Sequence, residues 1–306
     1  MSNDPKSPVT GSANVSLVKS VDTTHLIEIY RRVYKTDVSK NFSGLAEVQV
    51  WRCDDTGYEF FTPFTTAGDA QFYEELYGHD VDAFYMDNKW EHLIAKDWVK
   101  KNQLVLDIGC GGGAFLAMLR DKTSELYGLE QSRVGQQEAA AKGVTVSGDD
   151  VISFSKTAAN KYDMVSSFQV LEHVADVKPF LEAKIAMVKP GGLMVISVPN
   201  NDAFIRLDPN FVLNAPPHHV GLWRRSSLEA IGKLYGLEII HIEREPLQEK
   251  NIGWFTALME QRHIKGGLAR KVYYKMGFSR MLQNSIRETS STIDGHTIMM
   301  CYRKPA

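Results

Sequence analysis

The stretch Leu104-Val105-Leu106-Asp107-Ile108-Gly109-Cys110-Gly111-Gly112-Gly113 decides the fold. Its apolar start, residues 104–106, predicts a buried parallel strand, and glycines follow at once. Residues 114–119 are good helix formers, which predicts that a helix begins directly after the glycines. Such a turn is a seat for a cofactor, because glycines let backbone amides approach a ligand and a helix N-terminus carries about half a positive charge.

This turn has two interpretations. Residues 109–114 formally satisfy the G-x-G-x-x-G/A pattern of dinucleotide-binding folds, which is a weak signal alone. Asp107 lies two residues before the first glycine, where its carboxylate would repel a pyrophosphate and suit a cationic amino group. Residues 107–113 resemble motif I of the class I S-adenosylmethionine-dependent methyltransferases. In that family the turn holds the methionyl part of the cofactor, which implies cofactor-binding roles for Asp107, Gly109, Gly111 and Gly113.

Further cofactor contacts are expected after the next two strands. Residues 125–129 predict a second strand that ends at Glu130, 23 positions after Asp107, close to the roughly 20-residue offset of a ribose-binding acid. Glu130 could instead cap the helix that starts near Ser132, and Gln131 is counted with it as a cofactor contact. A third strand, 144–146, is closed by Asp149 and Asp150. The resemblance implies that one of this pair, preferably Asp149, meets the adenine amino group, although the residues alone indicate a turn.

Strand and helix patterns alternate from residue 104 onward, which predicts a parallel sheet covered on both faces. Residues 161–168 and 193–198 are the fourth and fifth strands, and 237–243 and 295–303 resemble the reversed pair that closes a methyltransferase sheet. The expected fold is therefore α/β, a Rossmann-like class I methyltransferase with a seven-stranded, mostly parallel sheet. Residues 246–294 are predicted to be a helical insertion, either a substrate cover or a solvated amphipathic helix pair.

The segment Gln169-Val170-Leu171-Glu172-His173-Val174 follows the fourth strand. It resembles the E-H signature of many small-molecule methyltransferases, including ubiquinone-pathway O-methyltransferases. Those enzymes place an acid of a metal site three residues before the glutamate, whereas this chain has Gln169, a further expected cofactor contact. His173 could accept a proton from a substrate hydroxyl, or it could brace a loop where a helix over 169–188 begins.

A second pair of candidate bases lies in the segment Asn214-Ala215-Pro216-Pro217-His218-His219-Val220-Gly221-Leu222-Trp223, which resembles a segment of glycan and secondary-metabolite methyltransferases. The prolines restrict the loop that presents both imidazoles. One histidine, preferably His219, is predicted to be a general base or a hydrogen-bond donor, with loop bracing as the alternative. No acid lies nearby at ligand spacing, so no metal is expected.

The N-terminal third divides into three parts. Residues 1–20 are rich in small and polar residues and predicted to be disordered. Residues 21–82 predict an accessory module of a helix and a hairpin that turns at 54–57, before the methyltransferase domain at 83–306. The hairpin resembles a zinc-binding module of sugar-modifying methyltransferases that has kept only Cys53, so it is expected to hold no zinc. Tyr85 belongs to an aromatic helix that could cover the cofactor or pack in the core.

Composition sets the remaining limits. The chain has 306 residues, a formal net charge of −2 and 43% apolar residues, which excludes the basic field of a nucleic-acid-binding protein. Its three cysteines are too scattered for a disulfide framework. No apolar run reaches the roughly 18 residues of a membrane span, and residues 1–20 lack a signal peptide's apolar centre. We expect a cytoplasmic monomer or homodimer with a small-molecule substrate and no nucleic-acid or membrane partner.

The function that these features favour is methyl transfer from S-adenosylmethionine to a hydroxyl of a sugar, a sugar nucleotide or another small polar metabolite. Two alternatives remain open at this level. A nicotinamide-dependent oxidoreductase would use the same glycine turn, and a non-catalytic S-adenosylmethionine-binding protein would hold the cofactor without transferring its methyl group.

Overall fold

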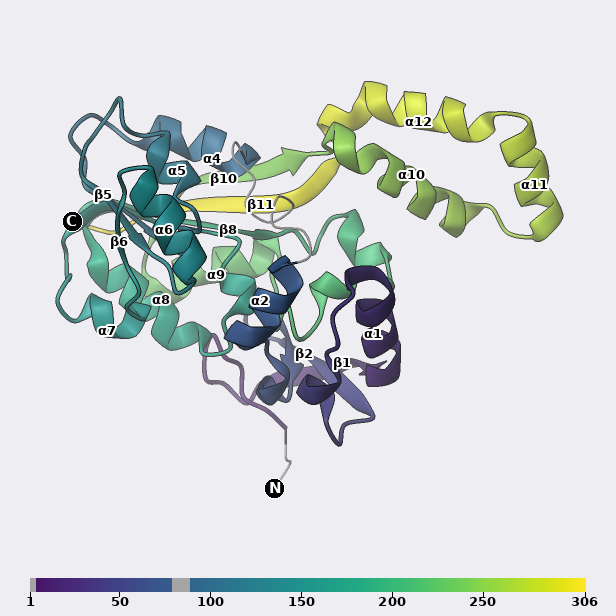
Figure 1. Ribbon diagram of the computed structural model, residues 1–306, viewed down its shortest axis with the longest axis horizontal. Coiled ribbons are helices and arrows are strands. Elements are labelled where there is room, and N and C mark those ends of the chain that lie inside the picture. The colour runs from purple at the N-terminus through teal and green to yellow at the C-terminus, as the bar shows by residue number, and fades with distance from the viewer. Residues whose placement is uncertain (1–3, 79–88) are drawn as a thin grey trace.

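The computed structural model describes residues 4–78 and 89–306. Its centre is a seven-stranded sheet in the order β10-β11-β8-β7-β4-β5-β6 (Figure 1). The strands are β4 (Val105–Ile108), β5 (Leu126–Leu129), β6 (Thr145–Ser147), β7 (Tyr162–Phe168), β8 (Val188–Pro199), β10 (Glu238–Pro246) and β11 (Asp294–Arg303). Neighbours from β6 to β8 pair in parallel, and β11 pairs antiparallel with both β8 and β10. The predicted sheet is confirmed, with β11 as the one reversed strand within it.

Helices cover both faces of this sheet, as the alternating sequence predicts. Val105 packs on one face with α4 (Trp90–Ala95), α5 (Ala114–Ala117) and α6 (Arg133–Ala141). Leu106, its neighbour along β4, packs on the opposite face with α7 (Val151–Ser155), α8 (Val177–Met187) and α9 (Arg225–Tyr235). Successive strand residues point to opposite faces, so two apolar neighbours contribute to two separate cores.

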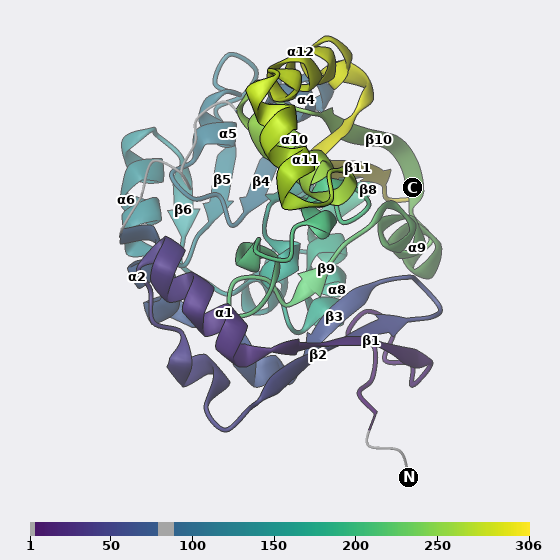
Figure 2. The same ribbon diagram turned by 90° about the vertical axis from the view of Figure 1, so that its right-hand side faces the viewer.

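A second, four-stranded sheet lies beside the first, in the order β1-β2-β3-β9 (Figure 2). It contains β1 (Val15–Asp22), the predicted hairpin of β2 (Glu47–Cys53) and β3 (Glu59–Thr62), and β9 (Gly221–Leu222). Helix α1 (Thr23–Ile29) follows β1 and is capped by the Asp22 carboxylate, which accepts from the His25 amide at 3.1 Å. A π-helical turn, Tyr30–Tyr34, extends α1, and α2 (Ala70–Gly78) packs nearby through Phe72.

The expectation of disorder over residues 1–20 is wrong for the described residues 4–20. Val9 is buried in the main apolar cluster, and residues 15–20 lie in β1. This strand pairs antiparallel with β2 from Val15 to Asp22. Most of its side chains are exposed, and β1 is an edge strand of its sheet. Its order therefore comes from backbone hydrogen bonds to a partner about 30 residues away, which leave no apolar alternation in the sequence.

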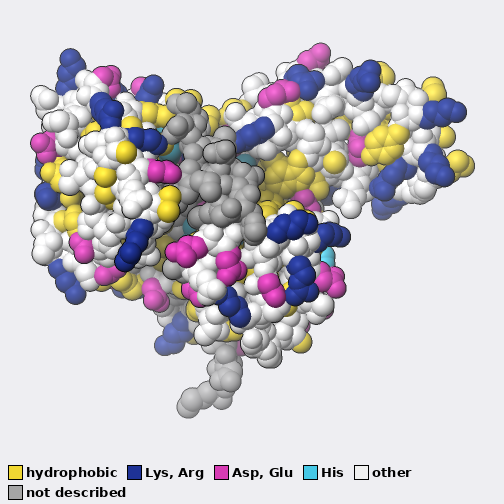
Figure 3. All heavy atoms as spheres, in the orientation of Figure 1, with side chains coloured by type: hydrophobic (Ala, Val, Ile, Leu, Met, Phe, Trp, Pro, Cys, Tyr) yellow, Lys and Arg dark blue, Asp and Glu magenta, His cyan; other side chains and the backbone are white. Residues whose placement is uncertain are grey.

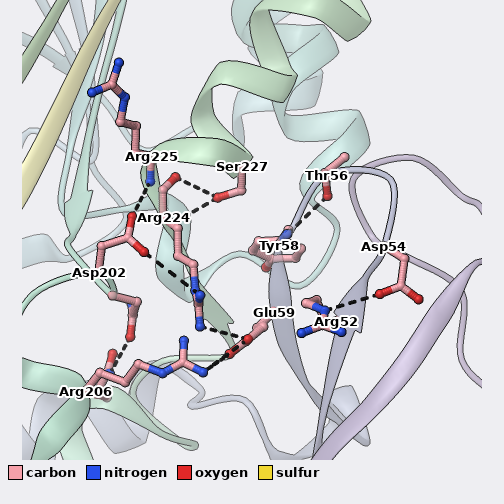
Figure 4. Close-up of polar contacts among 12 residues, drawn as sticks. Arg52, Asp54, Thr56, Tyr58, Glu59, Asp202, Arg206, Arg224, Arg225 and Ser227 are labelled. Carbon is pink, nitrogen blue, oxygen red and sulfur yellow. Dashed lines mark hydrogen bonds and ion pairs between the residues drawn. The ribbon is translucent and has the colours of Figure 1, made fainter.

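Strand β9 joins the N-terminal sheet to the chain that carries the paired histidines. Phe60 pairs with Gly221, and Glu59 is buried where the two parts meet. The Glu59 carboxylate accepts from the Arg224 guanidinium at 2.9 Å and from the Arg206 guanidinium at 3.3 Å (Figure 4). The N-terminal sheet is thus fastened by a buried carboxylate to two loops of the larger part.

The predicted helical insertion is a three-helix arm that projects from the sheet (Figure 1). It consists of α10 (Glu249–His263), α11 (Gly267–Lys275) and α12 (Phe278–Thr289), inserted between β10 and β11. Within residues 4–78 and 89–306, no helix combines the length and apolar character needed to cross a membrane.

Candidate active site

The glycine turn after β4 has the conformation that its sequence requires. Gly109, Gly111 and Gly113 have φ angles of 70°, 51° and 72°, in the left-handed region that residues with a side chain rarely adopt. A Cβ atom on Gly109 would lie 2.6 Å from Val170 Cγ2, in the segment that follows β7. The turn therefore exposes backbone at the carboxyl end of β4 and lies against the E-H segment.

Glu130 lies beside this turn at the carboxyl end of β5. Its Oε2 accepts from the Gly111 amide at 2.9 Å, and its Oε1 accepts from the Ser132 amide at 2.7 Å. Helix α6 is capped by Ser132, whose hydroxyl accepts from the Gly135 amide at 3.3 Å. Glu130 therefore joins the glycine turn to the start of α6, while the neighbouring Gln131 is exposed.

Asp107 is buried beneath the turn and does not lie on the surface where a ligand would bind. Its side chain is 3% exposed, and its Oδ1 accepts from the Ser166 hydroxyl at 2.8 Å. Burial raises the pKa of this carboxyl to about 7, partly offset by the Ser166 hydrogen bond and by the charge of Lys184. Lys184 is itself fully buried and donates to Ser167 Oγ and to the Val195 carbonyl.

The Asp149–Asp150 pair divides into two roles. Asp150 caps α7, and its Oδ1 accepts from the amides of Ile152 and Ser153, both at 3.0 Å. Asp149 accepts from the Ser147 hydroxyl at 2.7 Å and stays exposed at the carboxyl end of β6. Of the two, Asp149 is the one without a helix to cap, and its contact with the adenine amino group stays a prediction.

Gln169 has a φ of 57° and sits where β7 ends. Its Nε2 donates to Glu91 Oε1 at 3.3 Å and to Ser197 Oγ at 3.2 Å. Helix α4 therefore contributes a buried acid, Glu91, to the site region. Sequence reasoning missed this acid, which lies in a stretch with no recognisable motif. Tyr85, the expected aromatic cover, lies outside the described residues.

The E-H pair does not begin a long helix, so the expected helix over 169–188 is wrong in its first part. Residues 171–173 form a single 3-10 turn, and α8 starts only at Val177. Glu172 is 1% exposed, and neither of its carboxyl oxygens has a hydrogen-bond partner among the residues that the structure describes. Burial raises the pKa of Glu172 to about 8, so the group is largely protonated at neutral pH.

The structure brings His173, His218 and His219 together. Ring centroids are 4.7 Å apart for His173 and His218, 4.9 Å for His173 and His219, and 4.5 Å for His218 and His219. The Val220 amide donates to the Glu172 carbonyl at 2.9 Å and ties the two segments together. One nitrogen of each ring lies within 4.8 Å of the others, so these three residues could hold a metal ion, which the sequence did not lead us to expect.

Hydrogen bonds assign the tautomers of two of these rings. His173 Nδ1 lies 2.6 Å from the His218 carbonyl oxygen, which can only accept, so this nitrogen carries the proton. His219 Nδ1 lies 3.3 Å from Asn214 Oδ1, and Asn214 Nδ2 donates to Asn201 Oδ1 at 2.8 Å, which fixes the amide. In the neutral rings, Nε2 of both residues therefore keeps its lone pair.

Burial keeps all three imidazoles neutral. It lowers the pKa of His173 to about 4, and it lowers the pKa of His218 and His219 well below the ordinary value, with neighbouring imidazoles adding to the effect. A neutral imidazole can accept a proton, so the cluster has the protonation state of a general base. Tyr73, whose hydroxyl lies 3.0 Å from His173 Nδ1, and Asn214 support the cluster, and neither had been singled out as functional.

Comparison with known proteins shows which family and fold this chain resembles. Residues 77–242 match the sequence model of a family described as "Methyltransferase domain". A ubiquinone biosynthesis O-methyltransferase of Pectobacterium carotovorum is 28% identical over 179 residues, 55% of this chain and 69% of that protein. The Brucella ovis protein of the same name is 36% identical over 102 residues, 31% of this chain and 40% of its own length, so less than two thirds of it is covered.

Among solved structures, a SAM-dependent methyltransferase from Archaeoglobus fulgidus superposes with a TM-score of 0.53 and 21% identity. The superposition covers 77% of this chain and all of that one. At this identity the likeness concerns the fold, which it confirms.

Proposed function

The chain belongs to the methyltransferase-domain family and uses S-adenosylmethionine, and we propose from its site that it transfers the methyl group to a hydroxyl oxygen of a small metabolite. Family membership argues against the nicotinamide-dependent alternative. A non-catalytic cofactor-binding protein would need no base beside the cofactor seat, whereas this chain has three neutral imidazoles there.

One observation carries the proposal: the cofactor turn and the histidine cluster share the same edge of the sheet. Gly109 directly follows β4 and lies against Val170, which comes three residues before His173. The His219 segment is bonded to Glu172 through the Val220 amide. In a parallel sheet, ligands bind outside the carboxyl ends of the strands, so a methyl donor on the turn would face an acceptor beside the histidines.

We assign the donor seat to the residues around the turn. The glycine turn would hold the methionyl part against its exposed backbone, Glu130 would accept from the ribose hydroxyls, and Asp149 would accept from the adenine amino group. The amides of residues 109, 110, 111 and 113 already donate within the protein and therefore shape the turn. Asp107 acts from behind the turn rather than by surface contact, because it is buried in β4, and with its pKa raised to about 7 it carries part of a negative charge at neutral pH. When bound, S-adenosylmethionine supplies an electrophilic methyl carbon attached to a positively charged sulfur.

The acceptor chemistry falls to the histidine cluster. With S-adenosylmethionine bound, the acceptor oxygen would form its bond to the methyl carbon as the carbon–sulfur bond breaks and its electron pair returns to sulfur, which leaves as the neutral thioether. The proton of the acceptor would pass to Nε2 of His219, the nitrogen left unprotonated by the Asn214 contact. This is a base oriented by a third group, the arrangement typical of general-base sites. His173 and His218 then pack around that base, and His173 is held by the His218 carbonyl. Positioning supplies most of the rate, at about 7–11 kcal/mol, and a general base adds roughly 10²–10⁴-fold.

Two lines of argument point to different classes of methyl acceptor. The sequence resemblances favour a sugar or sugar nucleotide, while the curated relatives carry names that place them in ubiquinone biosynthesis. The names support oxygen as the methylated atom, and no contact in the described residues favours a sugar. We therefore propose a hydroxylated small molecule, with aromatic hydroxyls as the first class to test.

The experiment is a mass-shift screen with purified full-length chain and S-adenosylmethionine. One panel holds phenols and catechols, and a second holds sugars and sugar nucleotides; a product heavier by one methyl group identifies the acceptor. Calorimetry with S-adenosylhomocysteine and with NAD runs in parallel. Uptake of NAD in place of S-adenosylhomocysteine would overturn the proposal, and cofactor binding without transfer to either panel would favour the non-catalytic alternative.

A further experiment, with a chelator, tests whether the enzyme needs a metal. Gln169 stands where the resembling enzymes have a metal-site acid, and it is bonded to Glu91 and Ser197. We expect turnover to survive dialysis against EDTA. Loss of turnover that returns with a divalent cation would instead assign the three histidines to a metal.

A further inference from the structure

We propose that the distal end of the arm, residues 264–283, docks on the surface of an anionic lipid bilayer. We refer to this segment, which contains α11 and the first turns of α12, as the arm tip. The proposal goes beyond methyl transfer, is independent of it, and departs from the expectation of no membrane partner drawn from the sequence.

The arm tip is strongly basic. It contains five basic residues and no acidic residue, whereas the whole chain has 35 basic and 37 acidic residues. The five are Lys265, Arg270, Lys271, Lys275 and Arg280, and all of them are exposed. Positive charge is thus concentrated in the arm tip, although the whole chain has a net charge of −2. Figure 3 shows basic side chains gathered on the visible face of the arm's far end.

The same segment exposes large apolar side chains. Leu268, Met276 and Met281 are 79%, 63% and 64% exposed, more than any other large apolar side chain among the described residues. Val272, Tyr274 and Phe278 add to this surface. Single exposed apolar residues are normal, but a contiguous group between basic residues marks an interaction surface. The visible face of the arm carries apolar and basic side chains side by side (Figure 3).

The base of the arm packs against the rest of the protein, which fixes the position of the arm tip. Ile252, Leu258 and Ile286 pack in one apolar cluster with Phe204 and Ile205. Trp254 Nε1 donates to Asp208 at 2.7 Å. Beyond this cluster, α11 has no buried residue, and Tyr274 reaches back to Glu260 at 2.7 Å. The arm therefore holds its tip away from the sheet (Figure 1).

An anionic bilayer surface matches both properties at once. Basic residues are attracted to anionic headgroups, and Leu, Met and aromatic side chains enter the boundary between headgroups and acyl chains. A nucleic acid would engage the charges but leave the apolar side chains in water. A second copy related by two-fold symmetry would bring like charges together, because both copies would use the same patch.

The test is co-sedimentation of the full-length chain with vesicles. We expect at least tenfold more binding to phosphatidylcholine vesicles with about 30% phosphatidylglycerol than to pure phosphatidylcholine, with binding weakened by salt. One variant removes charge, Arg270→Gln with Lys271→Gln and Lys275→Gln. Another removes apolar surface, Leu268→Ser with Met276→Ser and Met281→Ser. Each is expected to lose at least tenfold in binding.

The matched control is Lys233→Gln with Leu234→Ser on α9, a basic and an apolar residue of which Leu234 is 48% exposed. It should bind as the natural sequence does. All substituted side chains are exposed, so coincident thermal unfolding curves will show that each variant folds. Equal binding of the arm variants, or no preference for anionic vesicles, overturns the proposal. So does a dimer in sedimentation velocity that the arm substitutions dissolve, or duplex DNA that binds the arm more tightly than the vesicles do.

Discussion

Glu130 Oε2 lies 2.9 Å from the backbone nitrogen of Gly111 and accepts its hydrogen bond. The acid at the end of β5 and the glycine turn at the end of β4 are therefore held together before any ligand is present. The other carboxylate oxygen of Glu130 accepts from the Ser132 amide, so hydrogen bonds to both oxygens fix the orientation of the group. A preorganised acid of this kind binds a ligand without the entropy cost of ordering a side chain.

We predict that Glu130→Ala weakens S-adenosylhomocysteine binding by at least tenfold in calorimetry, because it removes an acceptor and loosens the turn. Asp107→Ala should weaken it too, through loss of charge behind the turn. Glu125→Gln, at the opposite end of the same strand, is the control and should bind normally. Unchanged affinity in Glu130→Ala would remove this acid from the cofactor seat.

Replacing His218 and His219 together by alanine should preserve cofactor binding and lower turnover by roughly 10²-fold or more. Asn214→Ala should lower kcat with little change in KM, because it only orients His219. His241→Ala, whose ring stacks on Trp98 at 4.9 Å, serves as the control. Undiminished turnover in the double variant would exclude both histidines from the mechanism.

Glu172 should make the protein less stable as pH rises. Its pKa is raised from 4.5 to about 8 by burial, so above 4.5 the unfolded chain loses a proton that the folded chain keeps. This group's stabilising effect is therefore complete below 4.5 and lost as pH rises through about 8, at a limiting slope of about 1.4 kcal/mol per pH unit.

The measurement is urea unfolding between pH 6.5 and 8. The histidines of the unfolded chain also titrate in this range, and the comparison between variants removes their common contribution. Glu172→Gln should flatten the curve relative to the natural chain, and the exposed Glu47→Gln should not. Asp107 also has a raised pKa, so its contribution to the free energy of unfolding falls as pH rises as well. The test is therefore the difference between Glu172→Gln and Glu47→Gln. Parallel curves for Glu172→Gln and the natural chain would contradict an ionisable group held protonated at this position.

Glu59→Gln should destabilise the fold by about 1–3 kcal/mol in urea unfolding, because it leaves the Arg224 and Arg206 guanidinium groups without their shared carboxylate. Both arginines keep partial exposure, which limits the cost. Arg52→Gln breaks the exposed pair with Asp54 in the same region and is expected to leave the midpoint unchanged. Equal midpoints for the two variants would mean that Glu59 does not fasten the N-terminal sheet.

Local chemistry made the strand-turn-helix unit at 104–119 predictable. Apolar residues, glycines and helix formers follow one another there, and each acts through its immediate neighbours. The hairpin at 54–57, the alternation of later strands and the order of the acids were readable for the same reason. Burial was harder to read: Asp107 and Asp150 look alike in sequence, yet one lies inside the sheet and the other caps a helix.

By itself, the sequence determined the cofactor fold and the candidate residues, because those signals depend on neighbours along the chain. Only the tertiary structure decided that β1 is ordered and that His173 meets His218 and His219. It also placed Tyr73 against His173, 100 positions along the chain, and separated the arm tip from the core. The physical reason is that pairing and burial between distant segments depend on how the whole chain packs, which no local pattern records.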